Sequence, residues 1–276
     1  MAGVDENLKV WSQGWDWSDA GEGWSDWWGG TPALWFGAIL PRIHAFVPTG
    51  TILEIAPGYG RWTQYLKDLY ERLVAVDLTE GCIEHCRERF SQATNIEYHV
   101  NDGRSLSMIE DESVDLVFSF DSLVHVDEDV LASYLDQLRT KLKPDGVGIF
   151  HHSNLGSYRT AVRMTIAAAR HVIPQRFVQR LVERGVLVNL GAWRAENVTA
   201  ASFVQLCDAA GLACIGQETV SWEHGSYKTD ALSMFTRRGS VWERPLCVVS
   251  NPGFRREAAR MARCYSRESF PRLGQQ

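Results

Sequence analysis

The chain has 276 residues, a net charge of −6, 45% hydrophobic and 22% charged residues. This length and composition predict a globular protein that buries a core, as one large domain or one domain with an inserted cap. The acidic balance argues against general nucleic-acid binding, and no apolar run approaches the roughly 20 residues of a membrane span.

Cysteine usage and the N-terminal residues indicate the compartment. The six cysteines form no Cys-x-x-Cys pair, which argues against a zinc site. Residues 1–9 are polar and acidic, unlike a signal peptide. We therefore expect a reducing, cytoplasmic location.

Residues 1–48 form a Trp-rich cap that holds seven of the eleven tryptophans, interleaved with acidic residues and glycines. We expect it to be ordered, because so much aromatic surface is unfavourable in water. A hydrophobic plug over one edge of a sheet is the interpretation we favour; an aromatic wall of a cofactor or acceptor pocket is the alternative. A helix is expected from Ala33 to Phe46. The tryptophans are Trp11, Trp15, Trp17, Trp24, Trp27, Trp28 and Trp35.

Residues 49–153 alternate strand and helix patterns, which is typical of an α/β domain with a parallel sheet. Ligands of such sheets bind beyond the carboxyl ends of the strands, here at the switch point between the first and fourth strands. The strands are expected near 51–56, 73–77, 96–100, 114–120 and 146–152, and the helices near 60–71, 80–91 and 128–142.

The stretch Thr51–Gly60 is a short apolar strand that ends in a proline and two glycines, and helical spacing follows from Arg61. Glycine lets backbone N–H groups approach a ligand, and a helix start favours negative charge. Asp77 ends the next apolar strand, about 20 residues further on, where an acid can bind both hydroxyls of a ribose. The pattern indicates a nucleoside ligand.

Missing features narrow the choice of nucleoside. No Gly-Lys-Ser/Thr follows the turn, so a triphosphate loop is not expected. The third glycine of the dinucleotide fingerprint would fall at Thr63, so a pyrophosphate fits poorly. A cofactor without phosphates fits better, and S-adenosylmethionine is the common one.

Five motifs in residues 50–153 resemble those of the class I S-adenosylmethionine-dependent methyltransferases, in the family's order and spacing. They are Glu54–Gly60, Val76–Asp77, Asn101–Gly103, Val114–Asp121 and Leu142–Gly146. The resemblance implies a Rossmann-like, doubly wound sheet of seven strands in the order 3-2-1-4-5-7-6. Ala56 stands where many members have glycine, which costs little unless the backbone must touch the cofactor there.

The resemblance also implies the cofactor site, with Asp77 on the ribose and Asp102 on the adenine. The residues expected to bind S-adenosylmethionine are Glu54, Ala56, Gly58, Gly60, Trp62, Asp77, Leu78, Asp102, Gly103, Phe120 and Asp121.

Methyl transfer from a sulfonium requires an aligned nucleophile and, for an alcohol, removal of its proton. The fourth and fifth strands end in Asp121 to His125 and in His151 to Asn154, and they should be neighbours. His125 is the first candidate for the general base, His152 the second, and Asp121 completes the catalytic set. Because strand side chains alternate, only one of His151 and His152 can face the site.

Two finer interpretations concern this rim. Asp121 with a histidine could hold Mg²⁺ against two neighbouring hydroxyls, a lesser alternative because only one carboxylate is evident. Glu223 and His224 are other candidate ligands, although loop solvation explains them as well. Segments 119–125 and 151–154 resemble methyltransferases that act on sugar hydroxyls in polysaccharide and natural-product pathways.

Residues 154–195 interrupt the α/β pattern, and we expect a helical lid insertion broken at Pro174. No Asp or Glu occurs from Gly146 to Val182, whereas arginines recur. The three interpretations are a solvated face paired with acids elsewhere, a lid over an anionic acceptor such as a sugar phosphate, and a membrane-surface role. The arginines at i,i+4 spacing are Arg176, Arg180 and Arg184.

Residues 196–276 are expected to complete the same α/β domain. Thr199–Ala210 has helical spacing, and Cys214–Trp222 with Ala231–Arg237 predicts an antiparallel hairpin. Residues 254–273 form a basic helical tail, for which we favour a docked helix and leave a homodimer contact open.

Together these features predict a methyltransferase that moves a methyl group to a hydroxyl of a sugar or similar polar alcohol by in-line displacement. N- or C-methylation of a small molecule of secondary metabolism and a catalytically idle cofactor-binding module remain alternatives, and an NAD enzyme is a more distant one. The expected partner is a small-molecule acceptor, not nucleic acid.

Overall fold

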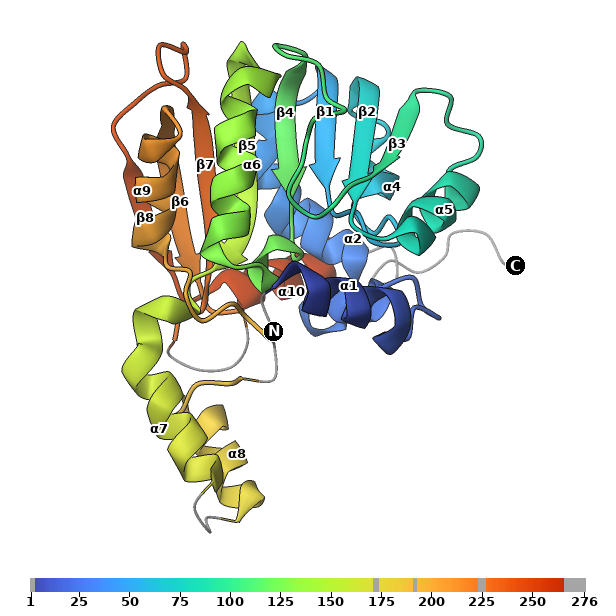
Figure 1. Ribbon diagram of the computed structural model, residues 1–276. Coiled ribbons are helices and arrows are strands. Elements are labelled where there is room, and N and C mark those ends of the chain that lie inside the picture. Colours follow the sequence, from blue (N-terminus) through green and yellow to red (C-terminus); the bar gives the residue numbers. More distant parts are fainter. Residues whose placement is uncertain (1–2, 171–173, 191–192, 223–226, 266–276) are drawn as a thin grey trace, which may run out of the picture.

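The computed structural model describes residues 3–170, 174–190, 193–222 and 227–265. These residues form one eight-stranded sheet with helices on both faces (Figure 1). The strands are β1 (Thr49–Ile55), β2 (Tyr70–Asp77), β3 (Ile96–Val100), β4 (Val114–Ser119), β5 (Leu142–Ser153), β6 (Leu212–Val220), β7 (Asp230–Arg237) and β8 (Cys247–Asn251). The α-helices are α1 (Val4–Lys9), α2 (Thr31–Leu34), α3 (Leu40–Ile43), α4 (Thr63–Leu66), α5 (Glu80–Arg89), α6 (Glu128–Lys141), α7 (Arg159–Arg170), α8 (Gln175–Glu183), α9 (Ala200–Ala209) and α10 (Phe254–Tyr265).

The strand order is β3-β2-β1-β4-β5-β7-β6-β8. Strands β1 to β5 are parallel, and β7 is antiparallel to both of its neighbours, which confirms the predicted closing pair. The expectation of seven strands is wrong: the first seven follow the order 3-2-1-4-5-7-6, and β8 adds an eighth strand parallel to β6. Its residues 247–250 are exposed on both faces, so no burial pattern marks the strand in the sequence.

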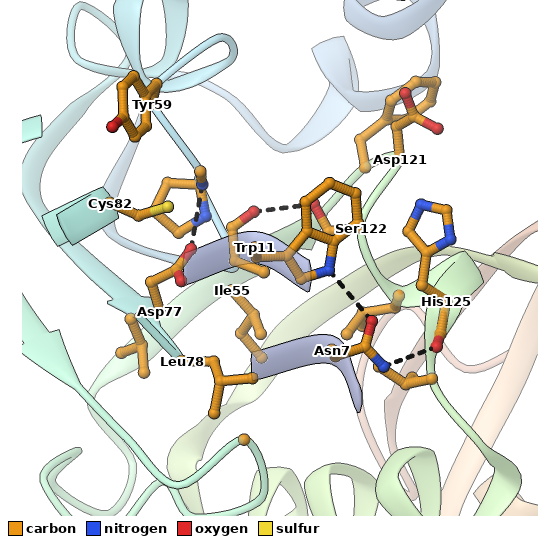
Figure 2. A pocket seen from close by; sticks show the side chains of 18 of the residues that line it. Asn7, Trp11, Ile55, Tyr59, Asp77, Leu78, Cys82, Asp121, Ser122 and His125 are labelled. Atoms are coloured by element: carbon orange, nitrogen blue, oxygen red, sulfur yellow. Dashed lines mark hydrogen bonds between the residues drawn. The ribbon is translucent and has the colours of Figure 1, made fainter. Parts of the chain in front are cut away.

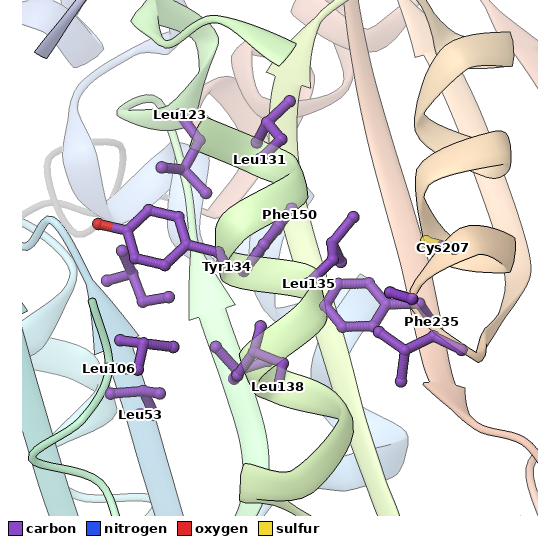
Figure 3. Packing of buried hydrophobic residues seen from close by; sticks show 14 of the residues in the cluster. Leu53, Leu106, Leu123, Leu131, Tyr134, Leu135, Leu138, Phe150, Cys207 and Phe235 are labelled. Carbon is purple, nitrogen blue, oxygen red and sulfur yellow. The ribbon is translucent and has the colours of Figure 1, made fainter. Parts of the chain in front are cut away.

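One face of the sheet packs against α6 and α9 (Figure 3). Leu53 and Ile55 of β1 point to this side, whereas Ile52, which directly precedes Leu53, belongs to the core on the other side, as strand alternation requires. Tyr134 and Leu138 of α6 fill the layer above them. The two buried faces explain why Ile52, Leu53 and Ile55 are all apolar although they point to opposite sides of the sheet.

The other face is covered by the N-terminal segment and α10. Trp28 and Trp35 are fully buried there, so this part of the Trp-rich cap plugs a face of the sheet rather than an edge. The basic C-terminal helix is docked, with Phe254 and Ala258 buried. A Cβ added at Gly37 would lie 3.0 Å from the Ala258 Cα, which shows how closely the N- and C-terminal segments pack.

The segments that surround the strand ends depart most from the predicted elements. The helix expected over 60–71 is reduced to α4, because residues 56–62 form a loop and β2 already begins at Tyr70. Helices α7 and α8 form a hairpin that projects from the sheet (Figure 1), with the break near Pro174 as predicted. Among the described residues, no helix is both long enough and apolar enough to cross a membrane.

Candidate active site

The loop after β1 has a backbone that only certain residues adopt easily. Ala56, Gly58 and Gly60 have φ angles of 58°, 58° and 83°. A Cβ at Gly60 would lie 2.5 Å from the Phe90 ring, so this glycine is required by packing as well. The expectation that Ala56 replaces glycine at little cost is wrong, because a left-handed backbone costs an alanine about 1–2 kcal/mol.

Glu54 lies beneath this loop and not in the cavity that the loop borders. Its side chain is buried, and one carboxyl oxygen accepts a 2.7 Å hydrogen bond from the Thr63 hydroxyl. Burial and then the nearby Asp77 raise the pKa of Glu54 to about 8. Glu54 thus ties the start of α4 to β1 and supports the loop from below.

Asp77 ends β2 beside the loop. Its Oδ2 accepts the Gly58 N–H at 3.1 Å, and its Oδ1 accepts the backbone N–H and the hydroxyl of Thr79 at 2.9 and 3.0 Å. Burial raises the pKa of Asp77, against the lowering effect of these hydrogen bonds. Oδ2 keeps a lone pair for a hydroxyl of a ligand.

The loop after β3 closes this cavity with Asn101 and Gly103. A Cβ at Gly103 would lie 3.0 Å from a methyl group of Val4. Asp102 between them is exposed, and its carboxylate accepts the N–H groups of Arg104 and Ser105 at 2.9 and 2.6 Å. The structure therefore places the neighbours of Asp102, and not its carboxylate, in the cavity wall.

The cavity, here called the cofactor cavity, is lined by most of the residues predicted to bind the cofactor. They are Ala56, Gly58, Trp62, Asp77, Leu78, Gly103, Phe120 and Asp121, whereas Glu54, Gly60 and Asp102 lie outside its wall.

The N-terminal segment covers the cofactor cavity (Figure 2). Asn7 donates to the backbone carbonyl of His125 at 3.0 Å and accepts from the Trp11 indole at 3.1 Å. The Trp17 ring stacks on Tyr59 of the glycine loop at 4.4 Å. The open space left is about 100 Å³, less than the roughly 300–1,000 Å³ of ligand sites. The cover must move outward before a nucleoside-sized ligand fits.

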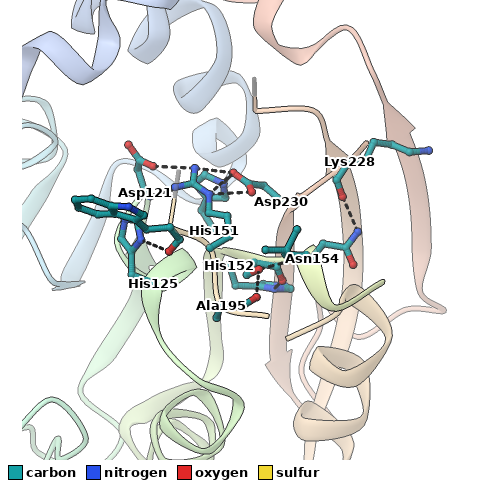
Figure 4. Close-up of polar contacts among 12 residues, drawn as sticks. Asp121, His125, His151, His152, Asn154, Ala195, Lys228 and Asp230 are labelled. Carbon is teal, nitrogen blue, oxygen red and sulfur yellow. Dashed lines mark hydrogen bonds and ion pairs between the residues drawn. The ribbon is translucent and has the colours of Figure 1, made fainter. Parts of the chain in front are cut away.

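Asp121 follows β4 at the far end of this cavity, with a φ angle of 63°. Its carboxylate pairs with Arg61 at 2.7 Å and with Arg194 at 3.5 Å, and its N–H donates to the His151 ring at 3.1 Å (Figure 4). Burial alone would raise the pKa of Asp121, but the two guanidinium groups hold it below the usual value. Asp121 is therefore an ionised anchor of this rim.

His125 borders the cavity in the short helical turn Leu123–His125. Its Nδ1 lies 2.9 Å from the Trp193 carbonyl, which can only accept, so the neutral ring carries its proton on Nδ1 and presents a lone pair on Nε2. Burial, and then the charge of Arg194, lower the pKa of His125 to about 4. The ring is neutral near pH 7 and can accept a proton, although only as a weak base.

The other two histidines of the predicted rim are enclosed in the sheet. His151 accepts from Asp121 and donates through Nε2 to Asp230 at 3.1 Å. His152 stacks on Phe203 at 4.2 Å, and its two nitrogens lie 2.8 Å from oxygens of Ser153 and Ser233. Neither ring lines the cofactor cavity or the larger cavity described next. The choice of His152 as second general base is therefore corrected, because this residue is fully buried in the core.

A second, larger cavity of about 1270 Å³ meets the first one at the rim and is here called the aromatic cavity. Ala169 of α7 and residues of α8 close it on the side of the hairpin. The two cavities share Trp11, Trp24, Asp121 and His125. Seven tryptophans line the aromatic cavity, namely Trp11, Trp15, Trp24, Trp27, Trp28, Trp193 and Trp222.

Comparison with known proteins agrees with this geometry. Residues 52–146 match the family model described as "Methyltransferase domain". Phosphoethanolamine N-methyltransferase 1 of Caenorhabditis elegans is 27% identical over 110 residues, which cover 40% of this chain and only 22% of that enzyme.

Among similar solved structures, one shows the same fold at a TM-score of 0.50. An S-adenosylmethionine-dependent methyltransferase of Mesorhizobium loti superposes with a TM-score of 0.50 at 17% identity, over 74% of this chain and 98% of that one. The PH0226 protein of Pyrococcus horikoshii gives a TM-score of 0.49 at 25% identity, over 69% and 82% of the two chains. Residues 52–146 are thus a methyltransferase domain, and the sheet has the class I S-adenosylmethionine-dependent methyltransferase fold.

The cofactor of this methyltransferase domain fits the residues of the cofactor cavity. Asp77 offers the acceptor that ribose hydroxyls need, and Gly58 and Gly103 leave room where a Cβ would approach Trp17 or Val4. Arg61, buried and lining the same wall, supplies a positive charge for the carboxylate of a methionine moiety. The ligand would occupy a space with one acid at one end and a guanidinium at the other.

The magnesium alternative is not supported by the donors at the rim. Asp121 already pairs with two guanidinium groups, and among the described residues no group of three His, Cys, Asp or Glu side chains could hold a metal ion. Glu223 and His224, the other candidate ligands, lie outside the described residues.

Sequence reasoning missed the charged residues that position the rim. Arg194 donates two hydrogen bonds of 3.0 and 3.1 Å from Nε and one of 2.8 Å from Nη2 to Asp230, and it also reaches Asp121. Burial would raise the pKa of Asp230, but Arg194 and then His151 hold it well below its usual value. Little in the sequence could have identified these residues. Arg61 directly follows the glycine loop, which is a weak indication. Arg194 and Asp230 belong to segments that come together only in the folded chain.

Proposed function

We propose that the protein is an S-adenosylmethionine-dependent O-methyltransferase whose acceptor is a sugar-containing small molecule, such as a glycoside, bound in the aromatic cavity. The observation that carries this proposal is the junction of the two cavities at Asp121 and His125. A cofactor held by Asp77 would present its sulfonium methyl group, which is already electrophilic, toward this junction. An acceptor in the aromatic cavity would approach from the opposite side.

The residues at the junction support a cofactor in one cavity and an acceptor in the other. His125 Nε2 can accept the hydrogen of an acceptor hydroxyl, while the Trp193 carbonyl fixes the ring orientation. Since the pKa of His125 is about 4, it takes the proton as the methyl group is transferred and not beforehand. Asp121, held by Arg61 and Arg194, keeps the loop before His125 in place.

The walls of the aromatic cavity support a sugar-containing acceptor. Flat tryptophan faces pack well against the C–H faces of sugar rings, and their N–H groups can donate hydrogen bonds. A space of about 1270 Å³ exceeds what a single sugar ring needs, which favours a glycoside or a short saccharide. The cover by residues 4–24 excludes water from the transfer.

A second candidate is transfer to an amine. The curated relative is by name an N-methyltransferase, and an amine needs less help from a base, which suits the low pKa of His125. An anionic sugar phosphate is a variant of the first candidate, which Arg194 and Arg255 in the cavity wall would favour.

The proposal is tested by mass spectrometry of a cell extract incubated with the protein and methyl-labelled S-adenosylmethionine. We expect a glycoside that gains one labelled methyl group on oxygen. Label on nitrogen would support the second candidate, and tight cofactor binding with no labelled product from extract or from a panel of glycosides and amines would indicate an idle binding module.

A further inference from the structure

The hairpin of α7 and α8 has two different sides. Toward the aromatic cavity α8 presents Val178, Gln179, Val182 and Glu183. Arg176, Arg180 and Arg184 are exposed and do not line that cavity. Their spacing puts them together on one face, about 130° around the helix from the mean direction of the cavity-lining residues by the 3.6-residue period. The arginine ridge is therefore not placed to bind an acceptor in the cavity.

Five arginines of the hairpin have no ionic partner among the residues that the structure describes. Within the part of the chain that the structure describes, no ion pair or side-chain hydrogen bond involves Arg159, Arg163 or the three ridge arginines. The only acid between Gly146 and Arg184 is Glu183, which lines the cavity. Although the chain has a net charge of −6, the hairpin thus carries a positive surface whose charges are not neutralised by neighbouring acids in the described part of the chain.

Large apolar side chains are exposed among these arginines. Met164 of α7 and Phe177 of α8 are 51% and 50% exposed. The Arg180 guanidinium lies 6.0 Å from the centre of the Phe177 ring. Arginines next to exposed aromatic and aliphatic side chains are characteristic of helices that lie in a membrane interface.

The placement of the hairpin favours a surface as its partner. It projects from the α/β body (Figure 1), so a flat anionic layer can contact it without lying against the acidic body, whose repulsion salt screens with distance. A nucleic acid would gain less, because Phe177 and Met164 would face a charged backbone instead of acyl chains. The two kinds of polyanion can be separated experimentally.

We propose that the α7–α8 hairpin docks the protein on an anionic lipid surface. The arginines bind lipid phosphates, and Phe177 and Met164 enter the boundary between headgroups and acyl chains. The opposite side of α8 remains the wall of the aromatic cavity, so binding at the surface leaves the active site intact.

The test is flotation of the full chain with vesicles of phosphatidylcholine alone or with 30 mol% phosphatidylglycerol, without cofactor or acceptor. We expect at least ten-fold stronger binding to the anionic vesicles. Each arginine near such a surface contributes a factor of about five, which corresponds to about 1 kcal/mol. The triple variant Arg176→Gln, Arg180→Gln, Arg184→Gln should therefore bind about 100-fold more weakly.

A matched control removes the same charge elsewhere. Arg72, Arg237 and Arg238 are ion-paired on the α/β body, and their triple Gln variant should bind vesicles within about three-fold of the unchanged chain. Phe177→Ser alone should weaken binding several-fold. Equal loss in both triple variants, or no preference for anionic vesicles, overturns the proposal. Hairpin-dependent retention of DNA without vesicle binding would assign the ridge to nucleic acid instead. Because no methyl transfer is measured, the outcome is independent of the proposed function.

Discussion

The two cavities that meet at His125 are built in different ways. The walls of the cofactor cavity are mostly loops at the ends of adjacent strands, held by backbone hydrogen bonds such as Gly58 N–H to Asp77. The aromatic cavity is made of side chains from segments far apart in the chain, from Trp11 to Arg255. The cofactor half is thus specified by short local motifs, and the acceptor half by tertiary packing. Changes in one half should leave the other half nearly unaffected.

Replacing Asp77 should give the largest difference between the effects on the cofactor cavity and on the aromatic cavity. Asp77→Ala removes the acceptor for a ribose hydroxyl and also the hydrogen bond that holds the Gly58 N–H in the cavity wall. Two hydrogen bonds to a carboxylate of about 1.5–3 kcal/mol each imply about 10²–10⁴-fold weaker cofactor binding. Isothermal titration with S-adenosylhomocysteine measures this loss. Asp102→Ala is the matched control, and we expect a change below about three-fold because this carboxylate bonds only within its own loop. Equal losses in both variants would contradict the assignment of Asp77.

His125 lies where the two halves meet, and its replacement should affect turnover alone. His125→Asn should lower kcat by about 10²–10⁴ and leave cofactor affinity within about three-fold. His152→Gln, in the enclosed histidine, should leave kcat nearly unchanged. Kinetics on the acceptor identified by mass spectrometry provide the measurement.

The pH profile gives an independent check on His125. Its pKa is lowered to about 4, so the ring loses its proton well below pH 6 and stays available as an acceptor above it. The acid limb of kcat due to this residue should lie near pH 4 and disappear in His125→Asn. A fall in kcat near pH 6.5, the usual pKa of a histidine, would show that burial and Arg194 do not lower the pKa of this ring.

Trp15 tests the aromatic cavity by itself. It lines only that cavity and packs on Trp24 and Trp193 at 5.4 and 5.6 Å. Trp15→Ala should raise KM for the acceptor about ten-fold, since stacking on one indole contributes about 1–1.5 kcal/mol, with cofactor affinity unchanged. Trp242→Ala removes an indole that lines neither cavity and should change neither constant. Weaker cofactor binding in Trp15→Ala would mean that the halves are coupled.

The different construction of the two cavities explains which features could be predicted from the sequence. Strands β1 to β5 and Asp77 follow from apolar runs and glycine spacing. The runs in β1, β2, β4 and β5 are largely buried, and Asp77 is the last residue of β2. Strand β8 was missed because its residues are exposed. The Trp-rich segment indicated aromatic burial, but not that Trp35 packs on the sheet while Trp15 lines a cavity.

The histidines show the limit of sequence reasoning at the catalytic rim. Strand order predicts that His125, His151 and His152 converge on one rim, yet of the three only His125 lines the cofactor cavity or the aromatic cavity. His151 hydrogen-bonds to Asp230 and His152 to Ser233. Both partners belong to β7, a strand some 80 residues away in the chain. Local pattern gives the position of a side chain on a strand, but not the partner that an antiparallel neighbour supplies.

The smallest predicted effect concerns the cofactor half, at the one place where its local motif departs from the family. Ala56 has a φ angle of 58°, so Ala56→Gly relieves a left-handed alanine and should raise the free energy of unfolding by about 0.5–1 kcal/mol after the added flexibility of the unfolded chain is counted. Urea denaturation measures the change. Ala167→Gly, at an exposed position within α7, should instead lower it by about 1 kcal/mol. If Ala56→Gly also destabilises the protein, the loop after β1 does not hold its left-handed backbone in solution.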